Sequence, residues 1–483
     1  MCRAALVTIA GLLLLQALGA VSKPLNGPDV FDQNVFADWS VAGGVDVALE
    51  EIQGAAGLEE NLIPHHQLRI TNSKSEVCDI TVKQHSGFLD ISDGRHLFFW
   101  FFEARNDPQN APLMLWLNVE CGNDTVHNPH SWNEHLNIIY LDEPIGTGYS
   151  YSSDGSKVNT LADLAVDVYA FLTIFLKRFP EYVSAPLHIA GESWGGHYVP
   201  TIASYVHEKN QEFKYYPRKG MIHVNLASVI LANGLTEPYS QFESIPDYKC
   251  GGAPYPYLEP ESAACGVLRT NRPVCLRMIN SCYKFKTKSV CAAATAECWP
   301  VMMGTGRDAR NPYDIRVDCN RNASVCYPEL DDAERWMNLP AVKKALGAPP
   351  AAQFKGCNYA VNSEFYLQGQ AIHNSAAFLP KLLHNGVRVM VYAGDVDSVC
   401  NYIGVELWMT RLQNDFHAEF SEAGNNLWRT KESGYLAGTV RGAGKGAGNY
   451  TFVRIFDAGH MAPHDQPEAT LDMIERWIHD RPW

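Results

Sequence analysis

Short apolar runs alternate with longer amphipathic stretches along most of this chain. Six runs have the length and the continuous apolar character of strands inside a parallel sheet, and they lie at residues 112–118, 137–141, 187–190, 227–233, 387–394 and 452–456. Apolar residues over 160–179 recur at helical spacing, with a start like a capping box at Asp163 and a stop at Pro180. Strands that alternate with helices predict an α/β fold with a mostly parallel sheet and helices on both faces.

The pattern changes at three places in the chain. Residues 82–90 and 96–103 are rich in aromatic residues and flank a Ser-Asp-Gly turn, which predicts a strand hairpin. Between about 236 and 346 the alternation stops and cysteine, proline and tyrosine accumulate, which indicates a cap insertion over the carboxyl edge of the sheet. From Gln466, apolar residues at helical spacing predict a last helix that packs against the core.

Composition and targeting signals narrow the class of protein. With 46% hydrophobic and 19% charged residues, the 483-residue chain can build a large core, and its net charge of −14 argues against nucleic-acid binding. Residues 1–22 are predicted to be a secretory signal peptide, because a basic residue precedes a short apolar core and small residues follow. That core is shorter than the ~20 residues of a membrane anchor, so no stable membrane insertion is expected. Sequons at Asn123, Asn322 and Asn449 are predicted glycosylation sites.

The most informative motif follows the third apolar run. Gly191-Glu192-Ser193-Trp194-Gly195 has the G-x-S-x-G pattern of a nucleophile elbow, in which a serine occupies a sharp turn between a strand and a helix. Glycine is expected on either side of the turn because the backbone passes close to its neighbours there. The Trp194 N–H would then face a developing oxyanion. The alternative is a glycine-rich turn with an ordinary surface serine.

A serine nucleophile needs a base, and the base needs an acid that orients it. Asp395 and Asp397 follow the run at 387–394, and His460 follows the run at 452–456. The order Ser, Asp, His is the order of α/β-hydrolases, and each candidate follows a strand. The pattern itself does not decide between the two acids.

Longer motifs carry a family resemblance. They lie at residues 131–133, 141–146, 148–152, 191–193, 197–200, 392–397, 400–401 and 458–463. In these motifs the chain, from about Val77 to its C-terminus, resembles the serine carboxypeptidases of the α/β-hydrolase fold, especially the fungal vacuolar carboxypeptidase Y type. The resemblance implies a propeptide at 23–75 and a catalytic domain at 76–483.

The resemblance also implies roles for individual residues. It makes Asp397 the acid of the triad with Ser193 and His460. It places Asn118, Glu192 and Met461 at the substrate, with the first two bound to the terminal carboxylate. The carboxyl group of Glu192 and the terminal carboxylate of the substrate would then lie too close together for both to be ionised, so peptide binding should favour acidic pH.

Cysteine use fits a secreted protein. Thirteen cysteines are present. None of them forms a C-x-x-C pair, which argues against a metal site. The resemblance implies a buried free thiol at Cys400 and four disulfides, Cys250–Cys265, Cys275–Cys298, Cys282–Cys291 and Cys319–Cys326.

One loop departs from the family pattern. The family follows Trp-Leu-Asn with Gly-Gly-Pro-Gly-Cys-Ser-Ser, which supplies one of two oxyanion donors, whereas only nine residues separate Asn118 from Asn128 here. The oxyanion-donor role of the family loop is therefore not assigned to Val119. The role of the substrate-binding glutamate in that loop is likewise not assigned to Glu120. Trp194 is the remaining candidate donor.

These observations favour a serine-type carboxypeptidase without a cofactor or metal. It would act on peptide or protein C-termini at acidic pH, in a vacuole- or lysosome-like compartment or outside the cell, with activity impaired by the short loop. Two alternatives stay open. One is an inactive hydrolase homologue that acts as a binding partner, and the other is an acyltransferase that uses the same triad on sugar esters.

Overall fold

The computed structural model describes residues 66–71, 77–78, 81–91, 94–117, 128–218, 220–304 and 310–483. The expected signal peptide, most of the expected propeptide, Asn118 and the short segment 119–127 lie outside these residues.

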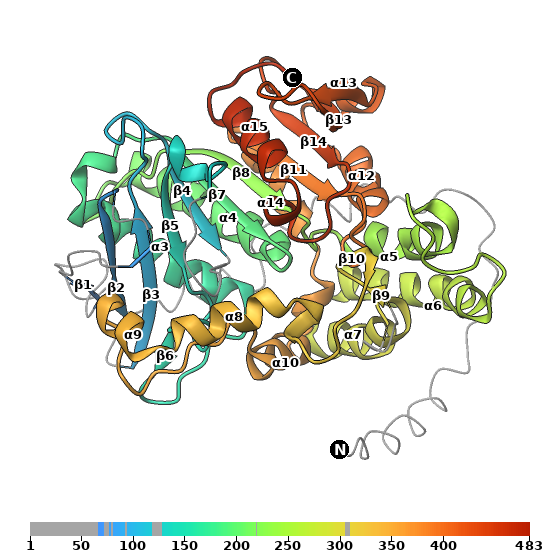
Figure 1. Ribbon diagram of the computed structural model, residues 1–483, viewed down its shortest axis with the longest axis horizontal. Coiled ribbons are helices and arrows are strands. Elements are labelled where there is room, and N and C mark those ends of the chain that lie inside the picture. The colour runs from blue at the N-terminus through green and yellow to red at the C-terminus, as the bar shows by residue number, and fades with distance from the viewer. Residues whose placement is uncertain are drawn as a thin grey trace. The chain divides into compact units, whose positions relative to one another are not determined.

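One large sheet organises the described chain (Figure 1). Its strands follow the order β1-β2-β3-β5-β4-β7-β8-β11-β14-β13-β12, and β6 pairs with β3. The strands are β1 His66–Thr71, β2 Gln84–Ile91, β3 Arg95–Phe102, β4 Leu113–Leu117, β5 Asn137–Leu141, β6 Tyr151–Ser152, β7 Leu187–Glu192, β8 Leu226–Ala232, β11 Arg388–Gly394, β12 Asn426–Arg429, β13 Leu436–Ala443 and β14 Tyr450–Ile455.

The sheet is mixed, with a parallel centre. All pairs along β5-β4-β7-β8-β11-β14 are parallel, whereas β1, β2, β3 and β6 on one side and β13 and β12 on the other pair antiparallel. The parallel sheet that the sequence predicts forms the centre, and antiparallel strands extend it at both edges. The antiparallel pairing of β2 with β3 confirms the predicted hairpin.

Both faces of the sheet are covered, as the continuous apolar runs predict. Phe99 of β3 packs against Phe171 and Phe175 of α3 (Leu161–Arg178), with ring centroids 5.4 and 6.0 Å apart. Phe98 and Trp100 belong to a different cluster, shared with α8 (Pro328–Met337) and α9 (Pro340–Leu346). Successive side chains of a strand point to opposite faces, so β3 is buried on both sides.

The central strands repeat this arrangement. Ile230 of β8 and Met390 of β11 share a cluster with Met473 and Trp477 of α15 (Pro467–Ile478). The neighbouring Val229 is also buried, and α4 (Gly195–Tyr215) packs against β7 and β8. Other described α-helices outside the cap are α11 Leu379–His384, α12 Tyr402–Arg411, α13 His417–Glu422 and α14 Ala462–Asp465.

The segment between β8 and β11 contains the expected cap. Apart from the short hairpin of β9 (Arg310–Asn311) and β10 (Asp314–Asp318), its described residues are mainly helical. Figure 1 shows α5, α6 and α7 gathered near this hairpin. The cap helices are α5 Pro238–Asp247, α6 Ala263–Phe285, α7 Lys288–Met302, α8 and α9, and α10 Tyr359–Leu367 follows them.

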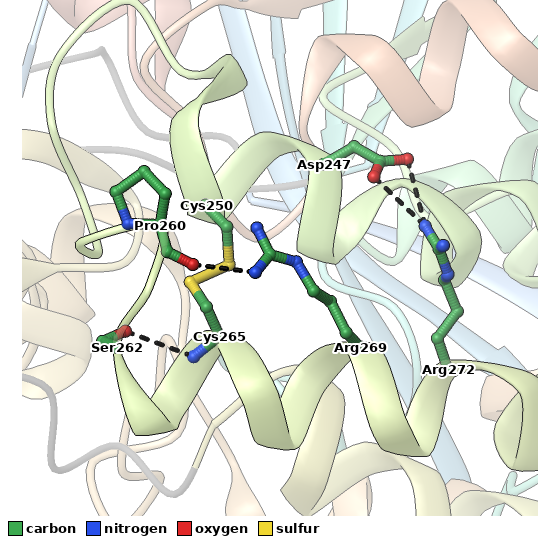
Figure 2. Close-up of a disulfide and its surroundings, with 7 residues drawn as sticks. All are labelled: Asp247, Cys250, Pro260, Ser262, Cys265, Arg269 and Arg272. Carbon is green, nitrogen blue, oxygen red and sulfur yellow. Dashed lines mark hydrogen bonds and ion pairs between the residues drawn. A yellow bond between two sulfur atoms is a disulfide. The ribbon is translucent and has the colours of Figure 1, made fainter.

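Disulfides and polar contacts hold the start of the cap (Figure 2). Cys250, just after α5, is bonded to Cys265 in the first turn of α6. The Ser262 hydroxyl accepts a hydrogen bond from the Cys265 N–H at 3.3 Å and so caps α6. Arg272 forms an ion pair with Asp247 at 3.1 Å. Three more disulfides, Cys275–Cys298, Cys282–Cys291 and Cys319–Cys326, join the pairs named from the resemblance.

Candidate functional site

The three candidate catalytic residues follow three strands of the parallel centre. Ser193 comes directly after β7, Asp397 three residues after β11, and His460 five residues after β14. Since these strands are parallel, their carboxyl ends meet at one edge of the sheet, where such folds build their sites.

The turn at Ser193 has the geometry of a nucleophile elbow. Ser193 has a φ of +57°, in the left-handed region that residues other than glycine rarely adopt. Its N–H donates to the Ala232 carbonyl at 3.0 Å, and its carbonyl accepts from the Leu235 N–H at 2.9 Å. Such a conformation costs of order 1–3 kcal/mol and persists only where the surroundings hold it. Helix α4 begins two residues later, so the Trp194 N–H lies at the start of a helix.

The glycines of the elbow are not equally constrained. A Cβ on Gly191 would lie 3.1 Å from the Gly195 Cα, which agrees with the expected close approach. A Cβ on Gly195 would meet nothing within 4 Å, so the steric reason given for that glycine is wrong. Gly196 is the tightly packed position, because its Cβ would lie 2.4 Å from the Leu235 carbonyl oxygen.

The candidate base and acid form a buried pair. His460 Nδ1 lies 2.7 Å from Asp397 Oδ2, and the side chains are only 6% and 0% exposed. The other Asp397 oxygen accepts the Val399 N–H at 2.8 Å. This arrangement fixes the imidazole tautomer with a proton on Nδ1 and leaves Nε2 to act on the nucleophile.

Asn233 is a contributor that the sequence analysis missed. Its Nδ2 donates to Asp397 Oδ2 at 3.0 Å and to the Gly459 carbonyl at 3.3 Å, so one amide holds the acid and the turn before the base. Asn233 has a φ of +41° and directly follows β8. A polar residue at the carboxyl end of a central strand was the signal that could have identified it.

Ser193 and His460 are not joined in this state. Among the described residues, no hydrogen bond links Ser193 Oγ to His460. Hydrogen bonds between nucleophile and base are often long without substrate and tighten in the complex.

Asp395, the other candidate acid, is engaged elsewhere. Its carboxylate accepts a hydrogen bond from Arg454 at 3.0 Å and another from the Asp457 N–H at 2.9 Å. Burial raises its pKa although Arg454 opposes the shift. Asp395 thus braces the turn after β14, while Asp397 contacts the imidazole.

Of the predicted substrate-binding residues, the structure describes Glu192 and Met461. Glu192 is buried at the end of β7, and Met461 is buried directly after His460. The Trp194 ring lies 6.0 Å from that of Phe365 and 5.8 Å from that of Tyr366, both on α10. Two aromatic side chains of α10 therefore pack against the residue that follows the nucleophile.

Two cysteines outside the disulfides differ in environment. Cys400 is a buried free thiol, and its Sγ lies within 4.8 Å of side-chain ligand atoms of Asp397 and His460. Burial raises the pKa of this thiol well above its ordinary value. Cys357 is a free cysteine at an exposed position.

A cluster of acids is buried beside the elbow helix. Asp142 and Glu143 follow β5, and Asp167 of α3 pairs with Arg95 at 2.8 Å. Burial raises the pKa of Asp142 and that of Asp167 to about 7. Burial, and then the charge of Asp167, raise the pKa of Glu143 well above its usual range. Both carboxylate oxygens of Glu143 are buried, and within the described part of the chain neither has a hydrogen-bond partner. The pKa of Tyr198 on α4 is raised mainly by burial and further by the charge of Glu143.

Two predictions concern the secretory route. Asn322 is exposed and Asn449 is half-buried, whereas Asn123 lies outside the described residues. In the part of the chain that the structure describes, no helix has the length and apolar character needed to cross a bilayer.

Comparison with known proteins decides the family. A profile described as serine carboxypeptidase matches residues 75–119 and 119–480. The chain belongs to the serine carboxypeptidase family. The match to the family is split at residue 119, where the sequence analysis places the short loop.

Relatives agree with this assignment. The chain is 40% identical to carboxypeptidase Y of Candida albicans over 86% of its own length and 77% of that protein. It is 36% identical to carboxypeptidase Y homolog A of Arthroderma gypseum over 93% of its length and 85% of the relative. Among solved structures it resembles Kex1Δp, a prohormone-processing carboxypeptidase from Saccharomyces cerevisiae. The TM-score is 0.67 at 22% identity, over 84% of this chain and 93% of the other, which shows the shared α/β-hydrolase fold.

Proposed function

We propose that this chain is a serine-type carboxypeptidase that releases C-terminal residues through Ser193, His460 and Asp397. The observation that carries the proposal is the buried 2.7 Å contact between His460 and Asp397, at the sheet edge where Ser193 occupies a left-handed turn. Membership of the family supports the reaction class.

In the proposed reaction, Ser193 Oγ attacks the scissile carbonyl carbon while His460 Nε2 takes its proton. Asp397 holds the Nδ1–H and stabilises the imidazolium. The tetrahedral oxyanion accepts a hydrogen bond from the Trp194 N–H. His460 then gives its proton to the leaving nitrogen, the C–N bond breaks, and an acyl-enzyme remains. Water attacks the ester by the same route in reverse and frees Ser193.

Recognition of the C-terminus rests on Glu192, Asn118 and Met461. Glu192 is next to the nucleophile in sequence and buried, which suits a group that meets the terminal carboxylate. Burial favours the neutral form of a carboxylic acid, and a second carboxylate favours it further. Substrate should therefore bind best at acidic pH, as in a vacuole- or lysosome-like compartment. The expected signal peptide, propeptide and sequons support a route through the secretory pathway to that compartment or outside the cell.

The short loop after Asn118 should limit turnover. Loss of one oxyanion donor costs on the order of 10²–10³ in kcat. A substrate misplaced by ~1 Å can lose ~10²-fold more. The unmodified chain should therefore turn over peptides far more slowly than a version with the family loop.

The test compares three proteins on a blocked dipeptide with a free carboxyl terminus and on its C-terminal amide. They are the unmodified chain, the same chain with Gly-Gly-Pro-Gly-Cys-Ser-Ser and the wall behind it restored after Asn118, and that restored chain with Ser193→Ala. At about pH 5 the restored chain should cleave the free acid and not the amide, and Ser193→Ala should abolish cleavage.

Each other outcome has a distinct meaning. Full activity of the unmodified chain would contradict the role given to the short loop and would point to another donor, such as the Gly122 N–H. No cleavage by either version would favour an inactive homologue that acts as a binding partner. Transfer of acyl groups to a sugar in place of hydrolysis would favour an acyltransferase.

A further inference from the structure

A hairpin of the cap contacts the turn that carries the candidate acid. The Ile315 N–H in β10 donates to the Val396 carbonyl at 3.1 Å. On the other side of Asp397, the Ser398 N–H and hydroxyl both donate to the Pro312 carbonyl, at 3.0 and 2.9 Å. The hairpin thus brackets the acid with main-chain bonds on both sides.

The same hairpin contacts the turn that carries the candidate base. The His460 N–H donates to the Tyr313 carbonyl at 2.8 Å, and the two rings lie 5.1 Å apart. A Cβ on Gly459 would lie 2.5 Å from that carbonyl oxygen, so the backbones pack as closely as glycine allows. Acid and base come from strands β11 and β14, and one cap element spans both turns.

Arg316 connects this hairpin to the base turn through its side chain. Its Nε and Nη2 donate to the two Asp314 oxygens at 2.9 and 2.7 Å, which fixes the guanidinium on its own hairpin. Its Nη1 donates to the Asp457 carbonyl at 2.7 Å. The group also lies 3.8 Å from Asp465 Oδ2, the oxygen that accepts the Gly459 N–H at 2.6 Å. One cation therefore contacts the start of the turn directly and its other end through Asp465.

The turn needs such support. Asp457 has a φ of +55°, a conformation that a residue other than glycine keeps only when its surroundings hold it. Its carboxylate is held by the Tyr255 hydroxyl at 2.7 Å, and its carbonyl accepts from Arg316 at 2.7 Å and from Gln466 Nε2 at 3.1 Å. Loss of Arg316 removes the shorter and charged one of these two donors, so the turn should loosen and His460 should shift relative to Asp397.

From this geometry we infer that Arg316 is a positioning residue for the proposed reaction, and that the β9–β10 hairpin sets the alignment of His460 with Asp397. Arg316 acts through the Asp457–His460 turn and touches neither substrate nor the reacting atoms. The inference rests on the proposed function and adds to it a cap residue that governs the chemical step.

The test uses the full chain with Arg316→Ala and Arg316→Lys, and Arg272→Ala as a matched control. Arg272 is also a cap arginine in an ion pair with an aspartate, and its side chain is 34% exposed against 28% for Arg316 (Figure 2). Arg316→Ala should lower kcat about 10- to 100-fold with KM within about twofold, because substrate binding does not use the base turn. Arg316→Lys keeps a charged donor but lacks the planar fork of the guanidinium, so its kcat should lie between those of the unsubstituted chain and Arg316→Ala.

Two further readouts separate positioning from a general loss of structure. Millimolar guanidinium chloride, far below denaturing concentrations, should partly restore kcat in Arg316→Ala and leave Arg272→Ala unchanged. Amide hydrogen exchange of residues 457–461 should become at least about tenfold faster in Arg316→Ala, with the core strands unaffected.

The outcomes decide the inference separately from the function. Unchanged kcat in Arg316→Ala, or an equal fall in Arg272→Ala, would overturn it. If Arg316→Ala does not fold, Arg316→Lys decides by the same measures. If the unsubstituted chain turns over too slowly to measure, the same substitutions are compared in the chain with the restored loop. If that chain also shows no turnover, the proposed function fails, and exchange alone decides: faster exchange at 457–461 supports the positioning role, and unchanged exchange overturns it.

Discussion

Replacing Glu143 by Gln should stabilise the protein at neutral pH and leave its stability at acidic pH almost unchanged. Glu143 lies in a buried cluster with Asp142, Asp167 and one cation, Arg95. Among the described residues its carboxylate oxygens have no hydrogen-bond partner, so the substitution removes an ionisable group and breaks no hydrogen bond there. A glutamine of the same shape leaves its amide in the same buried place, which costs much less than an unpaired charge.

The magnitude follows from the neighbouring acids. Burial raises the pKa of Asp142 and of Asp167 from 3.8 to about 7. One pKa unit corresponds to about 1.4 kcal/mol, so each of these carboxyls costs up to about 4 kcal/mol at pH ~7 relative to acid. Because the folded pKa is raised, this stability is complete below the unfolded pKa of ~4 and is lost as the pH rises through ~7. Glu143→Gln should recover on the order of 1–3 kcal/mol at neutral pH.

Urea unfolding followed by tryptophan fluorescence measures the free energy of unfolding at pH ~4.5 and at pH ~7.5. Glu143→Gln should raise the midpoint at pH ~7.5 and leave the midpoint at pH ~4.5 almost unchanged, so the difference between the two midpoints changes. Glu261→Gln, a change of the same kind at an exposed position, is the control and should leave that difference unchanged. No gain from Glu143→Gln at pH ~7.5, or an equal gain at both pH values, would refute the reasoning.

Three further predictions follow from the site. Asn233→Gly keeps the left-handed backbone but removes the amide that holds Asp397 and the Gly459 carbonyl, so kcat should fall about tenfold with little change in KM; an unchanged kcat would show that the amide is dispensable. Gly196→Ala should lower the free energy of unfolding by about 1–3 kcal/mol, because its Cβ would lie 2.4 Å from a carbonyl oxygen. Gly195→Ala should leave the free energy of unfolding unchanged or raise it, and equal effects of the two substitutions would contradict the packing described. Mass spectrometry after iodoacetamide treatment of the folded protein should find Cys357 modified and the buried Cys400 unmodified until the protein is unfolded, and a disulfide at Cys400 would disprove its free thiol.

The parallel centre of the sheet could be predicted from sequence because its strands are buried on both faces. Such strands must be continuously apolar, and the runs that lead to Ser193, Asp397 and His460 stand out for that reason. The antiparallel edges gave weaker signals. Strand β13 is rich in glycine and alanine, which have low strand propensity, and it forms by pairing with β14 and β12. Strand β1 lies within the expected propeptide and pairs with β2 along its whole length.

The candidate site divides in the same way. Motif order identified the candidate catalytic residues, and the resemblance decided between Asp395 and Asp397. The residues that hold them, Asn233 and Arg316, lie far from them in sequence, and their roles depend on contacts that no local pattern encodes. The steric argument at Gly195 failed for a related reason, since the backbone that passes closest belongs to Leu235 and meets Gly196.

The most direct test of the central claim is to label the chain with a fluorophosphonate at about pH 5 and map the modified peptide by mass spectrometry. The account predicts a single label, on Ser193, that disappears in Ser193→Ala and slows strongly in His460→Ala. A label that persists in Ser193→Ala, or that forms on another serine, would contradict it.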